Sequence, residues 1–178
     1  MPFMFGSRNT RALTADEIAL LPSDFILQID IQRLRLINRK HNPFVGNKIL
    51  ARNYELYWKD YPLDFTQSSV KTRSLLMHEL CHVWQYATNR LTALSYITHP
   101  KKWAYGYNFV SSKNFDDYET EKQADLLQDW HHMNHGYKPY RHHKDSCAPN
   151  LEQINAVVPF AWDVTPYEPV ENHDLLIS

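Results

Sequence analysis

The sequence predicts an α+β domain in which a small, mostly antiparallel sheet packs on two long helices. Residues 70–89 contain no proline or glycine and carry apolar side chains at helical spacings, which predicts the first helix. Residues 116–135 show a second helical pattern, and Gly136 follows it as a natural C-terminal stop. Residues 29–37 mix β-branched and basic side chains, residues 49–58 carry several aromatic ones, and we expect both stretches to be strands.

Capping residues mark the ends of the two long helices. Ser68 or Ser69 is expected to cap the first helix, and Asn89 is expected to end it. For the second helix, Asp116 is expected as the N-cap, with Glu119 at the capping-box position three residues later. These signals predict helices from about residue 70 to 89 and from about residue 116 to 135.

Shorter elements are expected on either side of this framework. Thr14 and Glu17 have the spacing of a capping box, which predicts a short helix that ends before Pro22. The stretch HNPFVGN at residues 41–47 predicts a turn or loop between the two strands. Residues 151–158 predict one more short helix near the end of the chain.

The length predicts one domain that spans residues 1–178, because a chain of this size buries a sizeable core and leaves little room for a second one. Pro159, Pro166 and Pro169 predict a loop-like C-terminal tail from about residue 159. We expect the last ten residues of that tail to be disordered.

Composition excludes several classes of function. A formal net charge of −1, with no long run of either sign, argues against nucleic acid as a partner. No apolar stretch approaches the ~20 residues of a membrane span. Residues 1–8 lack the features of a signal peptide, so we expect a protein made in the cytoplasm without one. Cys81 and Cys147 provide no disulfide framework, and both are expected to be reduced.

The most informative motif is His78-Glu79-Leu80-Cys81-His82, an HExxH pattern within the first long helix. On a helix, His78 and His82 lie four residues apart and face the same way, so their imidazoles can share one metal ion. Glu79 is then placed to act as a general base on water, which is what metal-assisted hydrolysis requires. A pair of histidines on a solvated helix surface is the alternative explanation of the same letters.

The second long helix offers carboxylates to complete a metal site. Glu121 is expected as the third ligand, and Asp125, one turn later, is expected to accept the second N–H of a ligating histidine. Glu119 is a weaker candidate for the third ligand because it fits better as a cap. A solvated acidic helix face is the alternative to this arrangement. A metzincin-type extension is excluded, because Gln85 and Thr88 stand where it requires glycine and histidine.

These motifs resemble a known class of enzymes. HExxH followed by Glu121-Lys122-Gln123-Ala124-Asp125 on a later helix resembles the gluzincin class of zinc metallopeptidases. The segment HELCHVWQY at residues 78–86 is similar to the HExxHVWQ segment of small bacterial peptidase-like domains associated with Rhs and VgrG proteins of type VI secretion systems. The resemblance covers roughly residues 45–130. Within that range, residues 53–58 and 64–65 are similar to the segment that precedes the zinc helix, and residues 117–118 and 121–124 are similar to the second motif. The sequence departs from the pattern at Cys81, where threonine is frequent.

The resemblance implies a zincin-like fold, one zinc ion and hydrolysis of peptide or amide bonds. His78, His82 and Glu121 carry over as zinc ligands, and Glu79 carries over as the base. The class also implies an effector toxin made in the bacterial cytoplasm and exported by a dedicated secretion machine, with a carrier in that machine and an immunity protein as partners. The substrate stays open between protein and cell-wall peptide.

Two function classes therefore stand beside each other. The first is a zinc-dependent hydrolase that cleaves peptide bonds by metal-activated water with Glu79 as base. The second is a non-catalytic, zinc-stabilised domain that binds a protein partner. Glu79 favours the hydrolase, because a structural zinc site has no use for a base and closes its fourth position.

Three further features stay open at the level of sequence. The strand at residues 49–58 is expected beside the metal helix, as an edge on which an extended peptide can lie. The aromatic and basic stretch at residues 98–107 either lines the cleft or forms an ordinary surface connection. His131 and His135 have the spacing of a second metal site but lack a flanking base. The group that stabilises an oxyanion is not determined among His131, His132, Tyr137, His142 and Tyr86.

Overall fold

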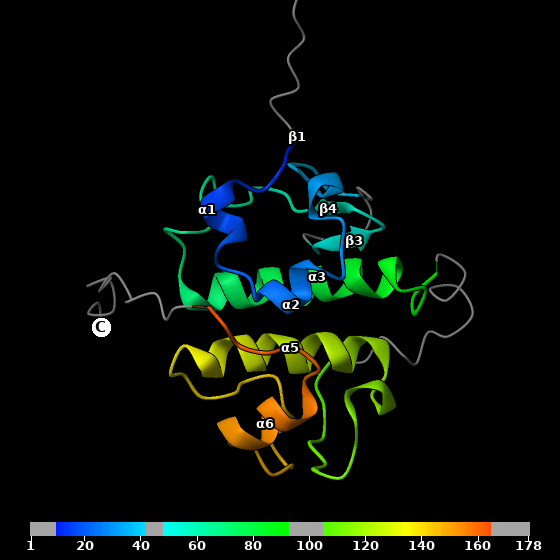
Figure 1. Ribbon diagram of the computed structural model, residues 1–178, viewed down its shortest axis with the longest axis vertical. Coiled ribbons are helices and arrows are strands. Elements are labelled where there is room, and N and C mark those ends of the chain that lie inside the picture. The colour runs from blue at the N-terminus through cyan, green and yellow to red at the C-terminus, as the bar shows by residue number, and fades with distance from the viewer. Residues whose placement is uncertain (1–9, 42–47, 93–104, 165–178) are drawn as a thin grey trace, which may run out of the picture.

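Two long helices form the centre of the molecule, and the remaining elements pack on their outer sides (Figure 1). The computed structural model describes residues 10–41, 48–92 and 105–164. The helices are α3 (Val70–Ala87) and α5 (Thr120–Asn134), and no other two elements share so extensive a contact. The sheet contacts α3, and α6 (Leu151–Val157) packs against α5. The predicted α+β class is confirmed.

The sheet is mixed, so the prediction of a mostly antiparallel sheet is wrong. Its strands are β1 (Thr10–Arg11), β2 (Arg35–Ile37), β3 (Leu50–Arg52) and β4 (Glu55–Tyr57), in the order β1-β2-β4-β3. The central strands β2 and β4 are parallel, whereas both outer pairs are antiparallel. The physical reason is that β3 and β4 form a hairpin whose second strand pairs with β2, which leaves β3 at the edge.

The two stretches expected as strands are shorter and more broken than predicted. Residues 49–58 form the β3–β4 hairpin, with Asn53 at a positive φ of 54° between the strands. Asparagine adopts this left-handed conformation more easily than most residues, so it supplies the turn. In residues 29–37 only β2 is a strand, because Ile31–Arg33 form a short 3-10 helix, η1.

The predicted capping box at the start of the chain is confirmed and also ties distant segments together. Thr14 caps α1 (Ala15–Ile18), and Glu17 closes the reciprocal bond to the Thr14 backbone. The Glu17 carboxylate is buried and also accepts hydrogen bonds from Arg11 and from the Phe65 backbone N–H. A second short helix, α2 (Ser23–Ile26), follows Pro22 and was not predicted.

The long helices begin and end near their predicted positions, with one exception. Ser69 caps α3, as expected, and Gly136 follows α5 with a φ of 85°. The predicted Asp116–Glu119 cap is wrong, because a 3-10 turn, η3 (Phe115–Asp117), occupies this stretch with its own capping box from Asn114. The chain then becomes extended at Tyr118 and α5 begins only at Thr120.

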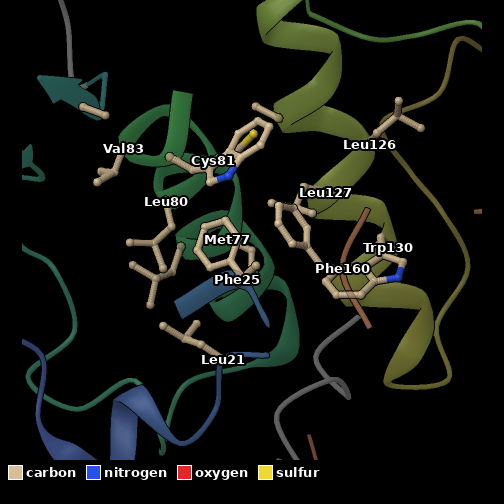
Figure 2. Packing of buried hydrophobic residues seen from close by; sticks show 14 of the residues in the cluster. Leu21, Phe25, Met77, Leu80, Cys81, Val83, Leu126, Leu127, Trp130 and Phe160 are labelled. Atoms are coloured by element: carbon tan, nitrogen blue, oxygen red, sulfur yellow. The ribbon is translucent and has the colours of Figure 1, made fainter. Parts of the chain in front are cut away.

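The core lies where α3 and α5 face each other. Figure 2 shows Met77 and Cys81 of α3 on the side toward Leu127 of α5, whereas Leu80 and Val83 lie on the opposite side of α3. The helices run antiparallel, since Gln85 near the end of one bonds to the backbone of Thr120 at the start of the other. This pairing brings residues about forty apart in sequence into one layer.

The C-terminal segment contributes to the core although it is irregular. The short helix predicted at residues 151–158 is present as α6. After it, Phe160 is buried, and its ring packs edge-on against those of Phe25 and Trp84. The described part of the predicted tail is therefore a loop that covers the core; residues 165–178 lie outside the described residues.

Neither cysteine forms a disulfide, since Cys81 is free and buried and Cys147 is free and exposed. Burial raises the pKa of the Cys81 thiol, which keeps it protonated as a small apolar packing residue within the motif. Among the helices described, none has the length and apolar character needed to cross a membrane.

Candidate metal centre

Two histidines of α3 and one glutamate of α5 converge on a single point. His78 Nε2 lies 3.6 Å from Glu121 Oε2, and His82 Nε2 lies 3.5 Å from Glu121 Oε1. One donor atom from each of the three side chains falls within 4.8 Å of the others, and all three residues are buried. In the part of the chain that the structure describes, this is the one such group of possible metal ligands.

The donor set and its spacing fit a tetrahedral metal ion. Zinc bonds to histidine nitrogen and carboxylate oxygen are about 2.0–2.2 Å long, so tetrahedral ligand atoms lie roughly 3.4 Å apart. The distances from the two histidine nitrogens to Glu121, 3.5 and 3.6 Å, are close to that value, with each nitrogen facing a different carboxylate oxygen. Glu121 Oε2 is buried and has no hydrogen-bond partner among the described residues, which leaves it available to a metal.

Each histidine has its other ring nitrogen beside a polar partner. His82 Nδ1 is 2.9 Å from Gln85 Oε1, and His78 Nδ1 is 3.3 Å from Asp125 Oδ1. The second contact has ion-pair distance, although the ring is not aligned for a full hydrogen bond. A partner at Nδ1 favours the tautomer in which Nε2 is the metal-binding atom.

Asp125 is held in place from two further directions. Its side chain is fully buried, and Oδ2 accepts the backbone N–H of Gly106 at 2.5 Å. Oδ1 accepts Nε–H of Arg141 at 2.7 Å. The structure thus places Asp125 where the sequence predicted it, beside a candidate ligand, and adds Gly106 and Arg141 as its supports.

Sequence reasoning missed a second set of supporting residues. Gln85, which faces His82, donates its amide N–H to the Thr120 carbonyl and to Gln123 Oε1, both at 2.9 Å. Gln123 in turn donates to the Phe115 carbonyl at 3.1 Å. The HVWQ and EKQA segments contained the signal for this chain of amides, since they supply both glutamines.

The charges of the site reinforce one another. Burial alone would lower the pKa of His78, but Asp125 and Glu121 raise it to about 9. The pKa of His82 is also raised, because Glu121 outweighs the opposing effect of burial. Burial acts to raise the pKa of Glu121, but the two histidines lower it to about 2. The pocket therefore favours a cation between these side chains, whether a proton or a metal ion.

Glu79 lies beside this centre at an open hollow of about 340 Å³. Its carboxyl group is buried, and burial raises its pKa, as does the charge of Glu121, against the opposing effect of the two histidines. A carboxylate with a raised pKa next to open space is suited to accept a proton from water. The described residues that line the hollow are Lys48, Ile49, Leu75, His78, Glu79, Tyr105, Gln128 and Arg141.

The open questions about the second histidine cluster and the aromatic stretch have partial answers. His131 is buried, forms a hydrogen bond with Ser74 at 2.9 Å and packs against the ring of His135, which also contacts Trp162.

None of the five residues considered for oxyanion stabilisation is among the described residues that line the hollow, whereas Tyr105 and Arg141 are. Tyr105 belongs to the aromatic stretch, of which residues 93–104 lie outside the described residues.

Comparison with known proteins places this site in context. No family model matches the chain. The chain is similar to the type VI secretion system spike protein VgrG2b of Pseudomonas aeruginosa, with 28% identity over 130 residues. That match covers 67% of this chain and 13% of the spike protein, so the chain spans only a small part of its relative.

A solved structure extends the similarity to the fold. The effector domain of Pseudomonas aeruginosa VgrG2b matches with a TM-score of 0.60 and 27% identity, over 68% of this chain and 73% of that domain. The likeness to VgrG-associated domains of type VI secretion systems that the motifs predicted is confirmed to this extent. In sequence and in fold, the chain is similar to the effector domain of a type VI secretion spike protein.

Proposed function

We propose that this chain is a zinc-dependent hydrolase that cleaves peptide bonds, with a zincin-like fold of the gluzincin type. One observation carries the proposal: Glu79 lies at an open hollow directly beside three converging donor atoms of His78, His82 and Glu121. Three protein ligands with an accessible neighbouring base are the arrangement of a catalytic zinc site.

The residues of the chain divide the chemical work among them. His78 Nε2, His82 Nε2 and a Glu121 oxygen would hold zinc, which supplies Lewis acidity to polarise a substrate carbonyl and acidify water. Glu79 takes the proton from the attacking water and returns it to the leaving nitrogen. Asp125 and Gln85 keep the two imidazoles oriented while this happens.

The alternative of a non-catalytic zinc-stabilised binding domain has less support. A structural zinc site is closed by a fourth protein ligand. Within the described residues the donor group has three members, and Cys81, in the motif itself, is not one of them. Glu79 also has no structural task, since no described hydrogen bond involves its carboxylate.

We also propose that the chain acts as an effector toxin of a type VI secretion system. The similarity to the effector domain of VgrG2b supports this role. On this proposal the protein is made in the bacterial cytoplasm, travels on a carrier of the secretion apparatus, and is neutralised in the producing cell by an immunity protein. The target is a protein or a cell-wall peptide.

The test compares the wild-type chain with Glu79→Gln, which keeps the size of the side chain and removes the base. Both proteins should bind one zinc ion per chain, measured by metal analysis after dialysis. Only the wild type should release new amino groups from casein or from purified peptidoglycan, and the variant should lose at least about 100-fold of that activity. Equal activity of the two proteins would refute the mechanism, and failure of both to bind zinc would refute the site.

A further inference from the structure

The hollow beside Glu79 is bordered by two cations whose charges the proposed reaction does not use. Lys48 and Arg141 both line it, and their formal charges offset those of Asp125 and Glu79. Lys48 is exposed and forms no ion pair with any described residue. Glu121, which faces His78, adds a third negative charge beside the hollow, and a bound zinc ion would add two positive ones. In the zinc-loaded protein an anion would therefore meet a net positive charge from these groups.

Arg141 is fixed in a way that leaves its outer end free. Its Nε bonds to Asp125 at 2.7 Å, and its backbone N–H bonds to Asp129 Oδ2 at 3.0 Å. The guanidinium carbon also lies 5.3 Å from the centre of the Tyr105 ring. Within the described residues, Nη1 and Nη2 make no hydrogen bond, and the side chain remains 28% exposed. These two nitrogens form a planar fork that matches a carboxylate.

Gln128 adds a buried polar atom without a partner. The side chain is 3% exposed, lines the same hollow, and donates its amide N–H to the Tyr140 hydroxyl at 2.5 Å. Its Oε1 is buried and has no hydrogen-bond partner among the described residues. Because the Tyr140 hydroxyl can donate as well as accept, the amide can turn over and offer N–H to a ligand in the hollow.

A buried amide atom without a hydrogen-bond partner destabilises the folded protein unless a ligand supplies that partner. The hollow thus combines a fixed arginine fork, a lysine without an ion pair among the described residues, and an amide oxygen without a hydrogen-bond partner there, all next to the candidate catalytic base. Lys48 also stands two residues before β3, the edge strand on which an extended peptide would lie.

We propose that this hollow is a carboxylate-binding subsite, in which Arg141, Lys48 and Gln128 hold a carboxylate of the substrate next to the scissile bond. The inference rests on the proposed hydrolase function and specifies its substrate as a peptide with a free carboxylate beside the cleaved amide. That carboxylate belongs either to an acidic side chain or to the end of a short peptide, and both present the same two oxygens to the arginine fork.

Binding to zinc-loaded Glu79→Gln tests the subsite without turnover. Three probes are titrated by calorimetry: acetyl-Ala-Glu-Ala-amide, acetyl-Ala-Gln-Ala-amide, and acetyl-Ala-Ala with a free C-terminal carboxylate. We expect one or both carboxylate probes to bind at least about 10-fold more tightly than the glutamine probe, since bonds between charged groups are the strong ones. The tighter of the two carboxylate probes identifies the source.

Charge-removing variants on the same background show where the preference arises. Arg141→Gln should abolish it and Lys48→Gln should reduce it about threefold, whereas Lys113→Gln, which lines a different hollow, should leave it unchanged. Zinc content is measured for each variant because Arg141 also supports Asp125. If Arg141→Gln loses zinc, the carboxylate preference of Lys48→Gln becomes the test of the subsite, since Lys48 has no described contact with Asp125 or the candidate ligands.

Two results would overturn the proposal. The first is that neither carboxylate probe binds more tightly than the glutamine probe. The second is a carboxylate preference that survives both variants, as direct coordination to zinc would produce. Failure of the hydrolase proposal is recognised separately. A wild-type protein that shows the carboxylate preference but cleaves no peptide fails as a hydrolase and keeps the subsite; one that cleaves without the preference keeps the hydrolase and loses the subsite.

Discussion

Asp125 Oδ1 lies 3.3 Å from His78 Nδ1, while the other nitrogen of the same ring faces Glu121. The carboxylates of Glu121 and Asp125 lie one helical turn apart on α5 and face opposite edges of the His78 imidazole. One of them is a candidate metal ligand, and the other contacts the ring of a second candidate ligand. This relationship makes α5, and not only the motif on α3, part of the candidate centre.

Replacing Asp125 with asparagine should weaken zinc binding by about 10- to 100-fold, the usual loss for an outer partner of a metal ligand. The reason is that the substitution removes the negative charge next to His78 Nδ1. Zinc affinity is measured by competition with a chromophoric chelator. Glu17→Gln is the matched control, because Glu17 is equally buried but lies in α1 and has no described contact with the ligands or with Asp125. An unchanged affinity in Asp125→Asn would show that Asp125 does not orient the ring.

The metal-free protein should lose stability as the pH rises from about 6.5 to about 9. The pKa of His78 is about 9 in the folded chain and about 6.5 when unfolded, so the folded state holds its proton more tightly. Its stabilising contribution is complete below pH 6.5, is lost by pH 9 and is at most about 3 kcal/mol. Thermal melts in a chelator should show this decline, and Glu121→Gln should reduce it.

Zinc should remove that decline, because the metal takes the place of the proton between the same side chains. Zinc affinity should accordingly rise with pH over the window in which His78 releases its proton. The same fall in melting temperature with zinc bound as without it would contradict the assignment of the pH effect to His78.

A second pH effect of opposite direction is expected from the histidines at the end of α5. Burial lowers the pKa of His131, and the charges of His135, Arg73 and His132 lower it further. At acidic pH the unfolded chain therefore binds a proton at His131 more readily than the folded chain does. Since this favours the unfolded state, the free energy of unfolding should fall as the pH drops below about 6.5. His131→Asn should be less stable at neutral pH but should show a smaller decline between pH 6.5 and 4.5.

The control for this effect is His41→Asn, which removes an exposed histidine and should leave the acid slope unchanged. The pH range of this comparison ends at 4.5 so that Glu121 does not contribute to the slope. The pKa of Glu121 is about 2 in the folded chain and about 4.5 when unfolded, so its stabilising effect is lost only below pH 4.5. An acid slope that is equal in His131→Asn and the wild type would place its origin elsewhere.

Gly106→Ala and Gly136→Ala form a matched pair that separates backbone strain from crowding at the site. Both glycines have a φ of 85°, and alanine in that conformation costs about 1–2 kcal/mol at either position. A Cβ at Gly106 would lie 2.7 Å from His143 Cε1, whereas a Cβ at Gly136 meets nothing within 4 Å. Urea unfolding should therefore show a larger loss of stability for Gly106→Ala.

The pair should also differ in zinc affinity. The Gly106 backbone N–H holds Asp125 Oδ2, so a shift of that backbone disturbs the partner of His78. Gly136 has no such contact among the described residues, and Gly136→Ala should bind zinc like the wild type. Equal zinc affinities for the two variants would show that the Gly106 bond does not support the centre.

Features that depend on a few neighbouring residues were predictable. The four-residue spacing of His78 and His82 places them on one face of any helix, and the capping box at Thr14 and Glu17 is likewise local. Helix periodicity also placed Glu121 and Asp125 on a common face of α5. What local patterns misjudged was the start of α5, where a 3-10 turn capped by Asn114 competes for the same acidic residues.

Sheet order and the walls of the hollow depend on contacts between distant segments. The parallel pairing of β2 with β4 follows from how a hairpin docks, which no periodicity within either strand encodes. Lys48, Gln128 and Arg141 come from three parts of the chain, and none of them belongs to a motif. Helical spacing in the sequence predicts which side chains are candidates to bind a metal and move a proton, because that spacing is a local property. The antiparallel arrangement of α5 against α3 and the surroundings of Glu79 follow from the folded chain, because burial and charge at that place are the sum of contacts far apart in sequence.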